Sequence, residues 1–289
     1  MEVILAEKAG FCFGVRKAVD TAFEQAEKVG TEGGEIYTFG PIIHNEEVVK
    51  SLEEKGVHAV RSKEELDKIA DDTNNVMIIR SHGISKAEQD ELIKKGFEII
   101  DATCPFVKRI HNTVREESQK GKHIIIIGNK NHPEVEGIMG WSTTPPTVIE
   151  SLEEVDDIKF EKDTSYCVVA QTTFNHNKFK EIVEKIQTLG YDVNVVTTIC
   201  NATYERQSES RKIAAKVDTM IVIGDTHSSN SKKLYEICKE ECEDTHFIQT
   251  LDDLNLDLTK SVRLVGITAG ASTPDYIIEE VQNYVRVDF

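Results

Sequence analysis

Residues 123–128 read His-Ile-Ile-Ile-Ile-Gly, and a polar loop with Asn-His-Pro-Glu at 131–134 follows them. A short apolar run that ends at glycine is typical of a buried strand in a parallel sheet. Val135, Ile138 and Met139 then fall at helical spacing, after a proline that suits the first turn of a helix. The stretch therefore predicts a strand, a polar loop and a helix in succession.

The same unit occurs twice more along the chain. Residues 36–40 (Ile-Tyr-Thr-Phe-Gly) lead to His44 and Asn45, and residues 219–224 (Thr-Met-Ile-Val-Ile-Gly) lead to Ser-Ser-Asn at 228–230. Apolar positions at helical spacing follow in both copies. The three copies lie roughly a third of the chain apart, which indicates an internal repeat.

A second family of loops contains a cysteine. Short apolar segments at 3–6, 97–100 and 193–196 lead to Cys12, Cys104 and Cys200. Helical periodicity follows the first two cysteines clearly, whereas the segment after Cys200 is more polar and gives the weakest pattern.

A third family of loops is rich in hydroxyl and imidazole groups. Its strands and loops are 76–79 with 80–83, 167–170 with 171–173, and 264–267 with 269–274. Any α/β chain alternates strands with helices, so alternation alone is weak evidence. The return of three loop chemistries in one cyclic order is stronger evidence for a threefold repeat.

The predicted fold class is α/β, with mainly parallel sheets covered by helices. We expect three domains, at 1–96, 97–192 and 193–289, related by a pseudo-threefold axis, with the loops at the carboxyl ends of the strands. Ligands of such sheets bind beyond those ends. Three units around one axis would bring the cysteines and polar loops to a central cavity.

Composition limits the function. The chain has 289 residues with 39% hydrophobic residues, 29% charged residues and a net charge of −17, so we expect a globular protein that does not bind nucleic acid. Its apolar runs are too short to span a bilayer, so we expect no membrane association. Residues 1–8 lack the features of a signal peptide, so we expect a cytoplasmic protein.

Three matching thiolates suit a metal site. Zinc with a fourth ligand is one possibility, and a [4Fe–4S] cluster with one open iron is another. Three buried structural cysteines are the third alternative, although that reading must explain why all three occupy corresponding loops. We assign no role to Cys167, Cys238 and Cys242, which do not correspond to one another.

The polar loops carry donors that suit an anion. Imidazole, hydroxyl and amide groups near the starts of helices favour a diphosphate pocket, and no nucleotide-binding glycine motif occurs. The candidate residues are His44, His82, His132, Thr172, Ser228, Ser229, Asn230 and Ser272.

Glu134 stands two residues after His132. A carboxyl group near a metal cluster and an anion can have a raised pKa and act as a proton donor. A glutamate that only complements the helix dipole is the alternative. The neighbours of Glu134 favour the role of proton donor.

Eight segments together resemble a known family, the 4-hydroxy-3-methylbut-2-enyl diphosphate reductases of the methylerythritol phosphate route to isoprenoids. They are 9–15 (Ala-Gly-Phe-Cys-Phe-Gly-Val), 40–45 (Gly-Pro-Ile-Ile-His-Asn), 80–83 (Arg-Ser-His-Gly), 101–105 (Asp-Ala-Thr-Cys-Pro), 131–135 (Asn-His-Pro-Glu-Val), 171–173 (Gln-Thr-Thr), 199–203 (Ile-Cys-Asn-Ala-Thr) and 269–272 (Ala-Gly-Ala-Ser). The resemblance covers essentially the whole chain, in order.

The resemblance implies a trefoil of three α/β domains, in which the N-terminal strand can pack with the last domain. It implies one [4Fe–4S] cluster on Cys12, Cys104 and Cys200, a substrate pocket lined by the eight candidate residues, and Glu134 as the catalytic proton donor. The implied reaction is a two-electron reductive dehydroxylation to isopentenyl and dimethylallyl diphosphate. We expect a ferredoxin or flavodoxin as electron donor, because no dinucleotide-binding fingerprint occurs.

One segment departs from the family pattern. The family usually has a lysine shortly before Ser-Ser-Asn, whereas residues 224–230 here read Gly-Asp-Thr-His-Ser-Ser-Asn. The change removes a positive charge near the expected diphosphate, and we expect His227 to point away from the phosphates. A non-redox cluster hydratase and a metal-binding regulator without turnover are the rival functions.

Overall fold

The computed structural model describes residues 2–32, 34–69, 74–254 and 262–287. The chain forms two compact units. The terminal unit comprises Met1–Arg16, Ile43–Lys50 and Asn201–Phe289, and the central unit comprises Lys17–Ile42 and Ser51–Cys200.

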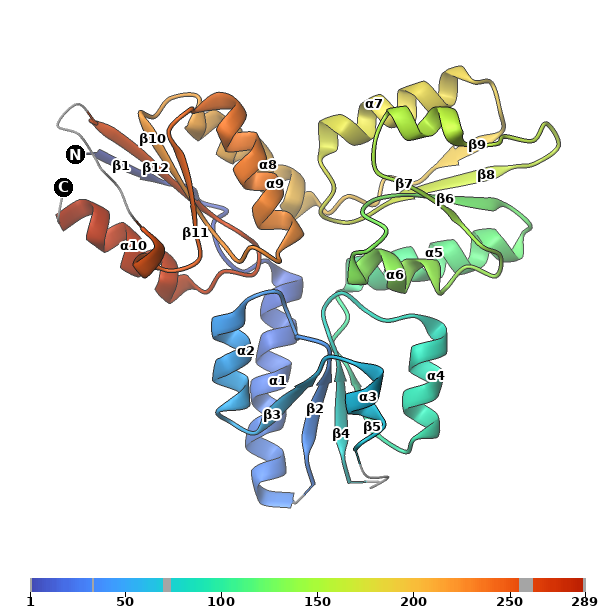
Figure 1. Ribbon diagram of the computed structural model, residues 1–289, viewed down its shortest axis with the longest axis horizontal. Helices are drawn as coiled ribbons and strands as arrows, with labels where there is room; N and C mark the ends of the chain where they lie inside the picture. Colours follow the sequence, from blue (N-terminus) through green and yellow to red (C-terminus); the bar gives the residue numbers. More distant parts are fainter. Residues whose placement is uncertain (1, 33, 70–73, 255–261, 288–289) are drawn as a thin grey trace. The chain divides into compact units, whose positions relative to one another are not determined.

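Three parallel sheets of four strands form the framework, which confirms the predicted α/β class (Figure 1). The first sheet has the order β3 (Val57–Val60), β2 (Ile36–Phe39), β4 (Val76–Ile79), β5 (Glu98–Asp101). The second has the order β7 (Thr147–Ile149), β6 (His123–Ile127), β8 (Tyr166–Ala170), β9 (Val193–Val195). The third has the order β11 (Thr245–Ile248), β10 (Thr219–Ile223), β12 (Leu264–Ala269), β1 (Glu2–Leu5).

The strand before each matching cysteine is an edge strand, at the same place in each order. β1 precedes Cys12 and pairs in parallel with β12, so the first strand of the chain completes the last sheet. In the same way, β5 and β9 pair with β4 and β8, the strands before them. The first two sheets therefore extend one strand beyond the repeat boundaries at 96 and 192, and the third sheet takes β1 from the first repeat. The division into three domains stays a prediction.

Helices cover the sheets. They are α1 (Phe13–Glu32), α2 (Glu46–Glu53), α3 (Lys63–Leu66), α4 (Lys86–Lys94), α5 (Pro105–Gln119), α6 (Pro133–Met139), α7 (His176–Thr188), α8 (Asn201–Ala214), α9 (Ser229–Glu241) and α10 (Asp275–Val287), with 3₁₀ turns η1 (Glu153–Asp157) and η2 (Leu251–Asp253). None of the described helices is long and apolar enough to cross a membrane.

The four isoleucines of β6 show why the strands are continuous apolar runs. Ile125 and Ile127 pack on one face with α7, and Ile124 and Ile126 pack on the other face with α5 and α6. Figure 1 shows these helices on opposite sides of the second sheet. Successive side chains of a strand point to opposite faces, so a sheet covered on both sides needs apolar residues at every position. Each such buried side chain stabilises the fold by about 1.5–3 kcal/mol.

The cysteines without a predicted role belong to the hydrophobic cores. Cys167 packs between β6, α5 and α6, and Cys238 and Cys242 pack with β10. Burial raises the pKa of Cys167 to about 11 and that of Cys238 to about 12, so these thiols stay protonated.

Candidate active site

The three matching cysteines are held by the same backbone contact. In each case the cysteine N–H donates to a carbonyl oxygen in the third loop family, which follows the neighbouring strand. The contacts are Cys12 N to Ala271 O at 3.3 Å, Cys104 N to Ser81 O at 3.0 Å and Cys200 N to Thr172 O at 3.0 Å. The equivalence predicted from the sequence is therefore present in the hydrogen bonds of the loops.

Each of these cysteines stands at the start of a helix and is half-buried. Cys12 precedes α1, Cys104 is the residue before Pro105 at the start of α5, and Cys200 precedes α8. A helix N-terminus favours negative charge, so these positions suit thiolate ligands. Cys12 belongs to the terminal unit, and Cys104 and Cys200 belong to the central unit.

Arg206 supports the Cys12 loop, and the sequence interpretation missed it. Arg206 is 3% exposed, and its guanidinium donates from Nε to Lys8 O at 2.8 Å and from Nη2 to Gly10 O at 2.6 Å. α8 buries further polar side chains, including Gln207 and Ser210. Because α8 buries polar side chains, the segment after Cys200 shows only a weak apolar pattern. The polar residues at these helical positions were the sequence signal for a buried polar face.

Glu134 is a buried acid in direct contact with Thr172. Its side chain is 2% exposed, and Oε1 accepts from Thr172 N at 2.6 Å while Oε2 accepts from Thr172 Oγ1 at 2.8 Å. Burial raises the pKa of Glu134 to about 7, although both hydrogen bonds from Thr172 act to lower it. The carboxyl group can therefore carry a proton near neutral pH.

Two of the three predicted histidines lie together in the central unit. The rings of His82 and His132 meet edge to face, with centroids 5.5 Å apart. His132 also caps α6, because its Nδ1 accepts from Glu134 N at 3.1 Å. Gly83 follows His82 with φ of 73°, and a Cβ there would lie 2.6 Å from Cε1 of His111. This close approach fixes the turn that carries His82.

The terminal unit brings together three other predicted residues. Ser228 caps α9 by accepting from Ser231 N at 3.3 Å, and Ser272 Oγ donates to Ser228 Oγ at 3.4 Å. Asn230 is 4% exposed, and neither polar atom of its amide has a hydrogen-bond partner among the described residues. Buried amides normally have partners, so Asn230 is available to a ligand. Ser231, fully buried behind this loop, was not predicted.

Asp225 joins this loop to the segment that carries His44. Its side chain is 4% exposed, and its Oδ2 accepts from Glu46 N, at the start of α2, at 3.2 Å. Oδ1 accepts from His227 N at 2.6 Å and contacts His227 Nδ1 at 3.1 Å. Asp225, in the segment that departs from the family pattern, thus has structural partners. His227 itself is 74% exposed, and its orientation toward phosphates stays a prediction.

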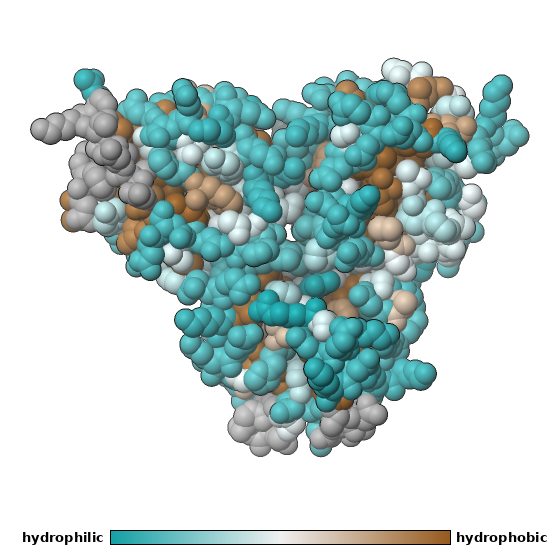
Figure 2. Space-filling model, in the orientation of Figure 1, coloured by the Kyte–Doolittle hydropathy of each residue, from teal (hydrophilic) through white to brown (hydrophobic). Residues whose placement is uncertain are grey.

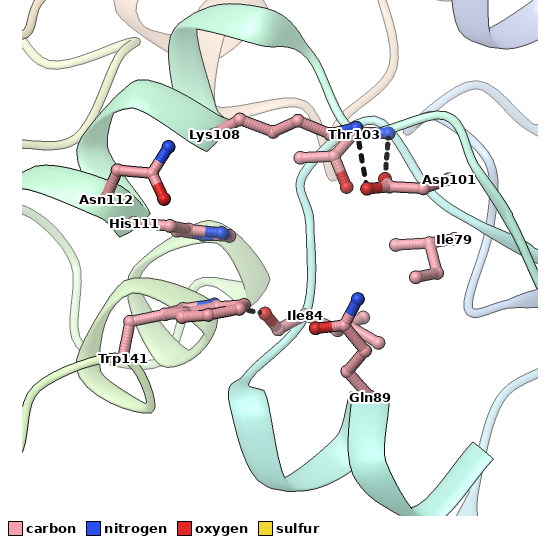
Figure 3. Close-up of a pocket in the computed structure, with 9 residues that line it drawn as sticks. All are labelled: Ile79, Ile84, Gln89, Asp101, Thr103, Lys108, His111, Asn112 and Trp141. Atoms are coloured by element: carbon pink, nitrogen blue, oxygen red, sulfur yellow. Dashed lines mark hydrogen bonds and ion pairs between the residues drawn. The ribbon is translucent and has the colours of Figure 1, made fainter. Parts of the chain in front are cut away.

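A cavity of about 180 Å³ is lined by Asp101 and Thr103, which come shortly before Cys104 in the chain (Figure 3). His111 stacks on Trp141 in its wall, with ring centroids 5.3 Å apart, and Trp141 Nε1 donates to Ile84 O at 2.9 Å. Burial lowers the pKa of His111 to about 4, so the imidazole is neutral at physiological pH. The His111 ring of this stack lies against the Gly83 turn, and no sequence motif pointed to this contact.

The fold and these loops define an internally repeated parallel α/β protein with three equivalent cysteine loops and a buried acid. The family model described as LytB protein matches residues 3–286, so the chain belongs to this family.

Named relatives match over the whole chain. Proteins named 4-hydroxy-3-methylbut-2-enyl diphosphate reductase from Thermoanaerobacter sp. (strain X514) and Clostridioides difficile (strain 630) are 46% and 44% identical, and the alignments cover 99% of this chain and 97% and 99% of theirs. The family resemblance found in the sequence is thereby confirmed.

Solved structures agree. A structure of (E)-4-hydroxy-3-methyl-but-2-enyl diphosphate reductase, described as the terminal enzyme of the non-mevalonate pathway, has a TM-score of 0.70 and 41% identity over 99% of both chains. A reductase structure from Plasmodium falciparum has a TM-score of 0.91 and 31% identity, over 98% of this chain and 87% of that chain.

Proposed function

We propose that this protein catalyses the reductive dehydroxylation of 4-hydroxy-3-methylbut-2-enyl diphosphate to isopentenyl and dimethylallyl diphosphate. The allylic C–O bond breaks, two electrons and two protons enter, and the oxygen leaves as water. The full-length relatives that carry this enzyme's name support the proposal. The observation that carries it is Glu134, a buried acid with a pKa of about 7 in contact with Thr172.

The cysteine loops fit a [4Fe–4S] cluster held by Cys12, Cys104 and Cys200. Their equivalent backbone contacts and positions at helix starts suit three thiolate ligands. When bound, such a cluster supplies the electrons and an open iron that polarises the substrate hydroxyl. Zinc fits three thiolates equally well but is redox-inactive, so the proposed reduction favours iron.

Glu134 is the proposed proton donor to the departing oxygen. At neutral pH a substantial fraction of its carboxyl groups holds a proton, because the pKa is about 7. Thr172 Oγ1 lies 2.8 Å from Oε2 and can pass this proton on, since a hydroxyl both accepts and donates. Burial keeps bulk water from competing for the proton.

Hydroxyl, amide and imidazole donors are proposed to bind the diphosphate. Asn230 offers an unpartnered buried amide, and Ser228 and Ser272 offer hydroxyls beside it. The full proposed set is His44, His82, His132, Thr172, Ser228, Ser229, Asn230 and Ser272. These local donors must hold an anion against a net charge of −17. His227 is proposed to take no part.

The electrons are proposed to come from a ferredoxin or flavodoxin in the cytoplasm. A single-electron protein donor matches a cluster that passes electrons one at a time. The three predicted repeats are proposed to act as domains, with β1 completing the last one.

An anaerobic assay tests the function. Protein reduced with dithionite and a viologen mediator is expected to convert the substrate into both diphosphate products. Glu134→Gln is expected to lose most of this turnover, while Glu136→Gln, an exposed residue on the same helix, retains it. Hydration without reductant would favour the hydratase, and cluster binding without turnover would favour the regulator.

A further inference from the structure

A second cavity, of about 310 Å³, lies in the central unit. Its lining includes Pro133 and Glu136 of α6 but neither Glu134 nor any cysteine. Gly40, Val60 and Arg80 line it, and they directly follow or end β2, β3 and β4. The sheet order β3-β2-β4-β5 changes direction between β2 and β4. Ligands of parallel sheets characteristically bind beyond the carboxyl ends of the strands at such a switch point.

Arg80 is the unusual group in this cavity. Its Nε is buried and has no hydrogen-bond partner among the described residues. Burial lowers the pKa of its guanidinium, and the charges of Glu88 and Glu136 oppose that effect without forming an ion pair in the described part of the chain. An arginine stays protonated in proteins, so its charge needs a counter-ion or water.

The backbone makes room for this guanidinium. Gly40 has φ of 72°, and a Cβ at this position would overlap Nη1 of Arg80. Only glycine adopts this conformation readily and leaves the space open. Gly40 therefore leaves room for the Arg80 guanidinium in the wall of the cavity.

The neighbouring charges leave Arg80 available. Arg61 and Lys63 line the same cavity together with Glu88, Glu91 and Glu136, so three cationic side chains, Arg80 included, face three carboxylates. Glu91 pairs with Lys63 at 3.3 Å, and Glu88 accepts from Ser85 N at 2.7 Å as part of the α4 capping box. Two of the three carboxylates in the cavity thus have a partner other than Arg80.

We propose that this cavity binds a small oxyanion, a phosphate or carboxylate group, anchored by Arg80. The planar guanidinium matches such groups through paired hydrogen bonds, and its unpartnered Nε supplies one donor. The proposal does not depend on the proposed reaction, because none of the residues that carry it belongs to the proposed catalytic or substrate set.

Phosphate binding tests the proposal. Inorganic phosphate is titrated at low ionic strength and followed by ³¹P line broadening in wild type, Arg80→Met and Arg80→Lys. Wild type is expected to bind, Arg80→Met to bind at least about ten-fold more weakly, and Arg80→Lys to fall between them, because lysine keeps the charge but loses the paired donors. If Arg80→Met fails to fold, weaker phosphate binding by Arg80→Lys than by wild type tests the proposal. Malonate is then added to the phosphate-bound protein to distinguish a phosphate ligand from a carboxylate ligand. Strong displacement of phosphate by malonate indicates that the site prefers a carboxylate.

Two controls locate the site. Arg109→Met removes an exposed arginine outside the cavity and is expected to leave phosphate binding unchanged. Asn230→Ala removes an amide of the proposed substrate pocket and is expected to retain the Arg80-dependent binding. Equal binding by Arg80→Met and Arg109→Met, or complete loss of binding in Asn230→Ala, would overturn the proposal.

Discussion

The side chain of Glu134 accepts two hydrogen bonds from Thr172, at 2.6 Å from its backbone N–H and at 2.8 Å from its hydroxyl. The carbonyl oxygen of Thr172 in turn accepts from Cys200 N at 3.0 Å. One residue therefore connects the buried acid to a proposed cluster ligand. This arrangement places the proposed proton donor, its proposed hydroxyl relay and the Cys200 loop in continuous hydrogen-bond contact.

Replacing Glu134 by glutamine should remove the transferable proton while preserving shape and burial. We expect kcat to fall by about 10²–10⁴-fold, the usual range for a lost general acid. In wild type the rate should decline as pH rises through about 7, because the acid must be protonated to act. A pH–rate profile measures both effects, and an unchanged profile in Glu134→Gln would exclude the acid role.

The Thr172 hydroxyl can be tested separately. Thr172→Ser retains an Oγ donor, whereas Thr172→Val removes it at similar volume. Because this hydrogen bond lowers the pKa of Glu134, the valine variant should shift the declining limb of the pH–rate profile to higher pH. A serine variant that behaves like the valine variant would show that the hydroxyl is not what matters.

Glu134 should also make stability depend on pH. Its pKa is about 7 in the folded protein and near 4.5 when unfolded, so between these values only the folded state holds the proton. Stability from this group is then present below pH 4.5 and is lost as pH rises to 7, by about 1.4 kcal/mol per pH unit.

Denaturant unfolding measures this contribution. Relative to wild type, Glu134→Gln should gain about 3 kcal/mol of unfolding free energy between pH 4.5 and pH 8, because glutamine does not ionise. A difference between the two proteins that does not change with pH would contradict the raised pKa.

Arg206→Met should destabilise the Cys12 loop. The variant loses two hydrogen bonds from a buried charged group to Lys8 O and Gly10 O, and we expect a loss of about 3 kcal/mol in unfolding free energy. Arg211→Met is the control, because this arginine of the same helix forms surface ion pairs worth at most about 1 kcal/mol. Iron release should also be faster in Arg206→Met, and equal rates in the two variants would refute a role in supporting Cys12.

Gly83→Ala should disturb the His82 turn through His111. Gly83 and Gly121 both have positive φ, 73° and 81°, but an added Cβ meets His111 only at Gly83 and nothing within 4 Å at Gly121. Both alanine variants carry the backbone strain of a positive φ. The additional loss of unfolding free energy in Gly83→Ala, about 1–3 kcal/mol, therefore measures the clash with His111. Thermal unfolding should show partial recovery when His111→Ala is added, and no recovery would indicate another cause.

The sequence predicted the strands that lead into the repeated loops, and the repetition of those loops. The apolar runs before Gly40, Gly128 and Gly224 formed central strands, and the three cysteine loops have equivalent contacts. It missed β3, β7 and β11, one strand in each sheet. These edge strands have three or four residues and lead to none of the repeated cysteine or polar loops, which marked the predicted strands of similar length.

The supporting residues of the site could not be read from local pattern. Arg206 bonds to a loop 196–198 residues earlier, and Asp225 bonds to a helix start 179 residues away. His111 of α5 lies close to the Gly83 turn, which comes before α4 in the chain. Such partners depend on the tertiary fold, whereas candidate residues in repeated loops are marked by their recurrence.

Iron and acid-labile sulfide, counted per chain in anaerobically prepared protein, test the central claim most directly. We expect about four of each in wild type. Alanine at Cys12, Cys104 or Cys200 should each cause loss of most of both, whereas Cys167→Ala and Cys242→Ala should retain them. Equal iron and sulfide in all five variants, or zinc in place of iron in wild type, would contradict the account.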